Sequence, residues 1–148
     1  QYQFTTNGVV YVRDLMTGNT DYLPVPSGTL DVLTALYAIR SRALETGTRF
    51  TLPVLDRGEA YRLHVAVRAR ERLDTVLGRS TATVRVGTYL EEAGTGRHQR
   101  PMQVWFTADR RQLPVRLVAD APLGSITLTL TGIRTTPPPD PQAGLACR

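Results

Sequence analysis

Hydrophobic and polar residues alternate with a period of two along most of the chain. The clearest case is the segment 61–70, where every odd position from Tyr61 to Ala69 is apolar and the even positions carry Arg62, His64 and two further arginines. This alternation is typical of a strand with one face in a core and the other in solvent. It recurs in the segments 50–54, 82–90, 102–106, 115–119 and 126–130. Short turns join these segments, which predicts a meander of neighbouring antiparallel strands.

The first 28 residues contain strong turn signals. Asn7-Gly8 lies between two β-prone runs, which predicts a hairpin because both residues tolerate positive φ. A second turn is predicted at 17–20 and an extended connector at 24–28.

The hydrophobic period becomes helical only in the segment from Thr29 to about residue 45. Apolar residues cover most of the circumference of this helix until Arg40 and Arg42, so we expect it to be buried against the sheet. Thr29 or Asp31 is the predicted cap, and Gly47 follows the end. The predicted fold is mainly β: a strongly curved antiparallel sheet, a half-barrel-like meander, packed around one buried α-helix.

Composition is that of a globular domain. The 148 residues are enough to bury one core, and no apolar run approaches the roughly 18 residues of a membrane-spanning helix. The net charge of +5 comes from 18 basic residues, all arginine. A GC-rich genome accounts for the absence of lysine, so the charge is only a weak indication of anionic partners.

The two ends of the chain differ from its middle. Residues 1–134 are assigned to the β domain, and the tail 135–148, with four prolines, is expected to be disordered or extended. Cys147 in this tail closes no internal disulfide; it is either idle or paired with another chain. The chain begins inside a strand pattern without Met or a signal segment, which suggests a processed or partial chain.

Residue patterns for catalysis, metals and cofactors are missing. His64 and His98 have no second ligand at metal-binding spacing, and no serine lies in a Gly-x-Ser-x-Gly turn. The glycine-containing run 94–97 lacks the Lys-Ser/Thr of a phosphate loop. We therefore predict no catalytic residue, no metal site and no cofactor, and expect a protein that is not an enzyme.

Arginines on one strand suggest a basic face. Arg62, Arg68 and Arg70 share the polar side of the predicted strand 61–70, and Arg85 and Arg116 are candidates to join them from other strands. Such a face would attract nucleic acid or anionic lipid. No exposed aromatic residues are interleaved for base stacking, and the solvent face of a sheet is usually charged, so nucleic acid is disfavoured.

Two further side chains are candidates for binding or for structure. Trp105 points away from the row formed by Val104 and Phe106, so it is either an anchor on a bare outer face or buried under the helix or under missing sequence. Arg40, near the end of a buried helix, needs a partner, which is either structural or bound.

Two segments together resemble a known family. They are residues 31–40, Asp-Val-Leu-Thr-Ala-Leu-Tyr-Ala-Ile-Arg, and residues 104–115, from Val104-Trp105 to Pro114-Val115, followed by 123–126. In this order they resemble the bacterial family catalogued as domain of unknown function 3108. Thr34 and Thr107 stand where the family often has serine. Members carry a further N-terminal block of strands, so this chain resembles the C-terminal part.

The resemblance implies an exported protein of the Gram-negative cell envelope, periplasmic or extracellular, with a curved sheet wrapped around a helix. It implies no reaction. The motif residues also have structural explanations: Asp31 caps the helix, Tyr37 and Leu36 fill the concavity of the sheet, and Asp109 shapes a turn together with Pro114.

These observations lead to three functional hypotheses. The first is a non-catalytic envelope domain that binds a hydrophobic ligand or a polypeptide in the concave face of the sheet. The second is a structural subunit of an envelope or surface assembly, in which a protein partner or missing N-terminal strands complete the sheet. The third is binding of nucleic acid or anionic lipid by the arginine face.

Overall fold

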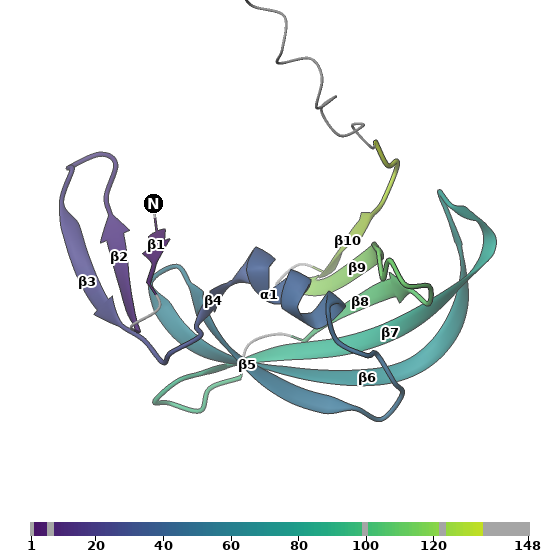
Figure 1. The fold of residues 1–148 in the computed structure, drawn as a ribbon, viewed down its shortest axis with the longest axis horizontal. Helices are drawn as coiled ribbons and strands as arrows, with labels where there is room; N and C mark the ends of the chain where they lie inside the picture. Colours follow the sequence, from purple (N-terminus) through teal and green to yellow (C-terminus); the bar gives the residue numbers. More distant parts are fainter. Residues whose placement is uncertain (1, 6–7, 99–100, 122–123, 135–148) are drawn as a thin grey trace, which may run out of the picture.

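The computed structural model describes residues 2–5, 8–98, 101–121 and 124–134 (Figure 1). The predicted tail 135–148 with Cys147, and Asn7 of the first turn, lie outside these residues. The described part folds into two β-sheets and one short helix. None of its helices is long and apolar enough to cross a membrane.

The larger sheet has seven strands in the order β10-β9-β8-β7-β6-β5-β4. Neighbours from β5 to β10 pair antiparallel, which confirms the predicted meander, whereas the two-residue β4 pairs parallel with β5. The sheet is strongly curved and remains open (Figure 1). Its strands are β4 Leu30–Asp31, β5 Arg49–Asp56, β6 Glu59–Thr75, β7 Gly78–Glu92, β8 Met102–Thr107, β9 Pro114–Ala121 and β10 Gly124–Thr129.

The first residues form a separate three-stranded sheet of β1 (Tyr2–Phe4), β2 (Val9–Arg13) and β3 (Thr20–Pro24). The predicted hairpin is present, since β1 pairs antiparallel with β2. Gly8 has a φ of 78°, and a Cβ there would lie 2.8 Å from the carbonyl oxygen of Val25. Glycine is therefore required here both by the backbone conformation and by the close approach of the connector.

The helix α1 spans Val32–Arg40 and is shorter than the predicted 29–45. Its start is delayed because Leu30 and Asp31 pair with β5, and Asp31 rather than Thr29 is the N-cap. Ser41 ends the helix, and its hydroxyl donates a hydrogen bond to the carbonyl oxygen of Ala38. Tertiary pairing thus overrides the apolar pattern at the beginning of the predicted helix.

The main core lies between α1 and the concave face of the large sheet (Figure 1). Ala35 and Ile39 of the helix are buried against apolar residues of β5 to β8. The opposite side of the helix is open: Leu33 is 70% exposed and Tyr37 is 62% exposed. The prediction of a buried helix is therefore correct for one face only: Leu36 packs against the core, whereas Tyr37 does not fill the concavity.

The two longest strands, β6 and β7, form a hairpin that bends away from the rest of the sheet (Figure 1). Their pairing shifts between Val67 and Ala69 and again between Leu73 and Thr75. Bulges of this kind bend a strand and increase its twist. They supply the curvature that lets the sheet wrap around a single helix.

Candidate functional site

A groove of about 550 Å³ crosses the outer face of the large sheet, opposite α1. Its floor is the cross-strand pair of Ala66 on β6 and Gly87 on β7. Arg49 of β5 pairs with Ala66, and Gln103 of β8 pairs with Gly87, so they flank this pair in the same row. The hollow exists because the two central residues of this row have the smallest side chains.

Stacked rings form one wall of the groove. The rings of His64 and Tyr89, which are cross-strand partners, lie 4.5 Å apart and nearly parallel, at 8°. The Nε2 atom of His64 lies 2.8 Å from Oε2 of Glu91, and the second carboxylate oxygen pairs with Arg62. Burial disfavours the charge of Glu91, but the hydrogen bond to His64 and the charge of Arg62 outweigh it and lower the pKa of this carboxyl.

Arg85 and its partners form the other wall. The Nε atom of Arg85 lies 2.7 Å from Oε1 of Glu71, although without hydrogen-bond alignment, and Nη1 donates to Gln103 at 3.1 Å. The indole nitrogen of Trp105 donates to Oε2 of Glu71 at 3.0 Å, and the guanidinium of Arg116 lies 5.4 Å from the Trp105 ring centre. Trp105 points outward, as predicted, but is only 8% exposed, so these neighbours cover it and it is not a bare anchor.

The lining of the groove is positively charged. It includes Arg49, Arg68 and Arg85, and none of the lining residues that the structure describes is aspartate or glutamate. The charge of Arg85 is balanced by Glu71. Neither Arg49 nor Arg68 forms an ion pair within the part of the chain that the structure describes. Two guanidinium groups at the groove therefore remain uncompensated.

The predicted arginine stripe is interrupted by the bulge. Beyond the bulge at Arg68, Arg70 pairs with Val84, a core residue that is 2% exposed, whereas Arg62 pairs with Glu91 on the outer face. Because cross-strand partners share a face of the sheet, Arg70 lies on the opposite face from Arg62. The sequence prediction placed both on one face because it assumed unbroken alternation.

Asp31 has the structural role expected of a cap. Its carboxylate accepts hydrogen bonds from the backbone amides of Leu33 and Thr34, at 2.9 and 3.0 Å, and from the Thr34 hydroxyl. The Thr34 hydroxyl makes the largest contribution to lowering the pKa of Asp31, followed by the Thr34 amide. The carboxylate therefore stabilises the first turn of α1.

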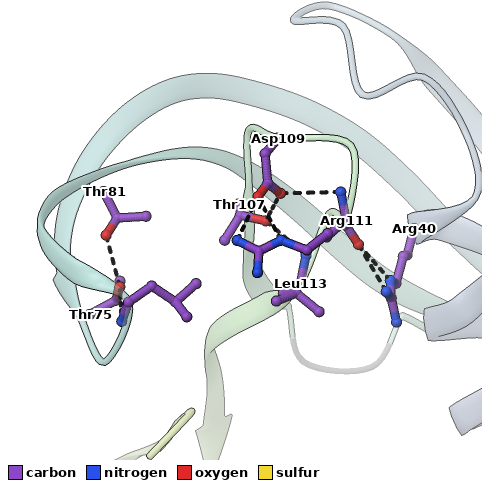
Figure 2. Close-up of polar contacts among 8 residues, drawn as sticks. Arg40, Thr75, Thr81, Thr107, Asp109, Arg111 and Leu113 are labelled. Carbon is purple, nitrogen blue, oxygen red and sulfur yellow. Dashed lines mark hydrogen bonds and ion pairs between the residues drawn. The ribbon is translucent and has the colours of Figure 1, made fainter. Parts of the chain in front are cut away.

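Arg40 has a structural partner. Its Nε and Nη2 atoms donate to the carbonyl oxygen of Arg111 at 3.0 and 2.9 Å, as Figure 2 shows. In return, the side-chain amide of Gln112 donates to the carbonyl oxygens of Arg40 and Arg42, at 2.7 and 3.1 Å. The C-terminal end of α1 is thus joined to the turn between β8 and β9.

Asp109 organises that turn (Figure 2). One of its carboxylate oxygens accepts from the Thr107 hydroxyl at 2.6 Å and from the Arg111 amide at 3.2 Å, and the other accepts from Nε of Arg111 at 2.8 Å. The hydroxyl of Thr107 also accepts from the amide of Leu113. Asp109 and Arg40 therefore belong to one polar cluster that positions the turn and the helix.

The concave face carries an apolar row that extends beyond the helix. The row runs through the paired residues Val67, Val86, Val104, Leu117 and Leu128, from β6 to β10. The first three residues are at most 2% exposed, whereas Leu128 is 60% exposed. On the next row, Ile126 of β10 is 55% exposed. The apolar face of the sheet thus continues, uncovered, to its edge.

The chemistry of these surfaces is that of recognition groups. Guanidinium, imidazole and amide donors gather in the groove, and such groups bind oxyanions. Within the described residues, no three His, Cys, Asp or Glu side chains gather where they would hold a metal ion.

Sequence reasoning missed Arg49, Gly87, Tyr89 and Gln103 as members of one groove. A signal was present at Gly87, because a glycine inside an alternating strand marks a bulge or a close approach. The pairing of four strands was needed to show that these residues meet. Glu91 was not singled out as a site residue from the sequence, and its pairing with His64 and Arg62 becomes visible only once β6 and β7 are aligned.

Comparison with known proteins identifies a family. Searches of curated proteins and of solved structures find no match. The family model described as protein of unknown function, DUF3108, matches residues 1–131, which include α1, the β8–β9 turn and β10. The chain therefore belongs to the DUF3108 family, as the two sequence motifs predicted.

Proposed function

We propose that this chain is a non-catalytic binding domain of the cell envelope that holds an extended polypeptide against the β10 edge of its concave face. The observation that carries the proposal is the apolar row from Val67 to Leu128, which is buried at one end and bare at the other. The envelope location is carried over from the family resemblance.

The edge itself favours a strand as the occupant. Among the described residues β10 pairs only with β9, so its other side presents free backbone donors and acceptors. Exposed edges are normally protected by charged residues or proline. The sequence of β10, Gly-Ser-Ile-Thr-Leu-Thr, contains neither. A partner strand would satisfy the backbone groups and cover the apolar side chains at once.

The exposed face of α1 also carries apolar residues. Leu33 and Tyr37 lie on the helix face directed away from its buried Ala35 and Ile39. Both α1 and β10 therefore leave apolar side chains uncovered, and uncovered apolar residues favour contact with a protein partner.

Charge favours a different protein over a second copy of this chain. Each copy carries a net charge of +5, so two copies repel one another, while an acidic segment is attracted. The proposed occupant is therefore an extended segment in which apolar and acidic residues alternate.

Hydrogen exchange with a model peptide tests the proposal. The probe is a peptide of alternating glutamate and valine, and a peptide of the same composition interrupted by proline is the control. We expect the first peptide to slow amide exchange in β10. Leu128→Lys and Ile126→Lys should each abolish this protection, whereas Thr127→Lys, which adds the same charge on the other face, should retain it.

Three outcomes would contradict the proposal. The first is that the alternating peptide does not slow amide exchange in β10. The second is that the proline-interrupted peptide slows it to the same extent. The third is that Thr127→Lys loses as much of this protection as Leu128→Lys and Ile126→Lys. A stable dimer in light scattering, with β10 protected in the absence of peptide, would assign the edge to a second copy instead.

A further inference from the structure

We infer that the groove on the outer face is a binding site for a small ligand that carries a phosphate or carboxylate group. The site is distinct from the proposed polypeptide surface, because Ala66 and Gly87 face away from the core that α1 covers. It is built from β5 to β8, strands inside the large sheet rather than at its edges.

Gly87 provides the first argument. Its φ lies outside the left-handed region, so the backbone does not require glycine at this position. Glycine inside a strand weakens the sheet, and a β-branched residue would be preferred there on structural grounds. A Cβ at this position would lie 3.1 Å from Nε of Arg68. The missing side chain therefore keeps the hollow open and lets the guanidinium group lie across its floor.

The charges provide the second argument. Arg49 and Arg68 line the groove without a carboxylate partner in the described residues, and Arg85 is held in place by Glu71 and Gln103. Guanidinium groups form paired, charge-assisted hydrogen bonds with phosphate and carboxylate groups. With no acidic residue among the described residues of its lining, the groove attracts an oxyanion and repels a cation.

Size and shape provide the third argument. A volume of about 550 Å³ is in the range of small-molecule sites. Nucleic acid would require a longer continuous basic track, and the bulge at Arg68 turns Arg70 to the other face. The ligand class is therefore a small organic anion rather than a nucleic acid chain.

Titration calorimetry with sodium phosphate, glycerol 3-phosphate and succinate tests the site. We expect saturable binding of at least one probe at one ligand per chain. Arg49→Ala and Arg68→Ala should each weaken binding by about tenfold or more, because each removes charge-assisted hydrogen bonds. Arg110→Ala, which removes the same charge from an exposed turn outside the groove, should change affinity by less than about twofold.

Gly87→Val is the most selective variant. Valine fits a strand, so the protein should remain folded by circular dichroism and thermal unfolding, while the filled groove should no longer bind the probe. Vesicles containing phosphatidylglycerol form a separate arm. If the natural protein binds these vesicles and both Gly87→Val and Arg68→Ala abolish this binding, the source of the phosphate is a lipid headgroup.

The inference would be overturned by an absence of saturation with every probe and with vesicles. It would also be overturned if Gly87→Val bound as well as the natural protein, or if Arg110→Ala lost as much affinity as Arg68→Ala. A different contradicting result is that the protein binds a DNA duplex but none of the small anions, with a duplex affinity that Gly87→Val does not change. That result would show a diffuse basic surface in place of the groove site.

Discussion

Asp109 accepts three hydrogen bonds, all from Thr107 and Arg111, which lie two residues before and after it. The hydroxyl of Thr107 makes the largest contribution to lowering the pKa of Asp109, and the Arg111 side chain adds to it despite partial burial of the carboxyl. A carboxyl with a lowered pKa stabilises the folded state while it is ionised. This stabilisation is fully present above the pKa of the unfolded chain and is lost as the pH falls through the lower pKa of the folded chain.

Replacing Asp109 with asparagine should make folding less sensitive to acid. At pH 7 we expect Asp109→Asn to lower the free energy of unfolding by about 1 kcal/mol. The substitution replaces a charged acceptor with a neutral one and so weakens its hydrogen bonds, and the partial exposure of the site keeps the loss small. Below about pH 4 the difference from the natural protein should shrink as Asp109 becomes protonated. Urea denaturation at a series of pH values measures this.

Asp120→Asn is the control for net charge, since Asp120 is an exposed carboxylate of β9 outside the turn. It should leave the free energy of unfolding at pH 7 within about 0.5 kcal/mol of the natural protein. A difference between Asp109→Asn and the natural protein that stayed constant from pH 7 to pH 3 would contradict the role assigned to ionised Asp109.

At the scale of elements, α1 is held at both ends by polar contacts. Asp31, the residue before the helix, caps its start. The end of the helix is held by the β8–β9 turn through Arg40 and Gln112, which are some 70 residues apart in the sequence. Nine residues are too few for an isolated helix to be stable in water. Packing of Ala35 and Ile39 and these end contacts together keep α1 helical.

Loss of the Gln112 side chain should loosen the end of α1. Gln112→Ala removes both hydrogen bonds to the carbonyl oxygens of Arg40 and Arg42, so we expect a loss of about 1 kcal/mol and faster amide exchange in the last turn of the helix. Hydrogen exchange followed by mass spectrometry resolves this segment.

A second variant separates the side chain from the backbone. Gln112 has a φ of 42°, which glycine adopts without strain, so Gln112→Gly removes the amide while relieving the backbone. Exchange in α1 should rise in both variants. A rise confined to Gln112→Ala would contradict the hydrogen-bonded link, because Gln112→Gly also lacks the side-chain amide.

At the scale of the whole molecule, the apolar concave face of the large sheet is core where α1 covers it and surface where α1 does not. Leu63→Ala should lower the free energy of unfolding by about 2–5 kcal/mol, because Leu63 is 6% exposed and packs in the core. Leu128→Ala, at a position 60% exposed, should change it by less than about 0.5 kcal/mol in the isolated chain. Urea denaturation of both variants measures the contrast. A loss at Leu128 as large as that at Leu63 would show that β10 is covered in the isolated protein.

The features of the fold that could be predicted from the sequence are those that depend on interactions between residues close together in the chain. Alternation, turn residues and capping groups act over a few neighbours, so they located β5 to β10, the first hairpin and the Asp31 cap. The helix was predicted too long because the pairing of Leu30 and Asp31 with β5 is not a local property. The candidate site was predicted less well, since only Arg68 and, as an added candidate, Arg85 of the groove arginines were named beforehand.

The sequence by itself determined the strand content, the place of the helix, the family motifs and the excess of arginine, because these depend on residue type and local spacing. Only the tertiary structure decided which apolar positions are covered, which face Arg70 takes beyond the bulge, and that Trp105 is sheltered by Glu71 and Arg116. The physical reason is that a one-residue bulge, invisible in the hydrophobic pattern, reverses the side-chain face of everything that follows it in the strand. The groove around Gly87 likewise exists only where four strands are aligned.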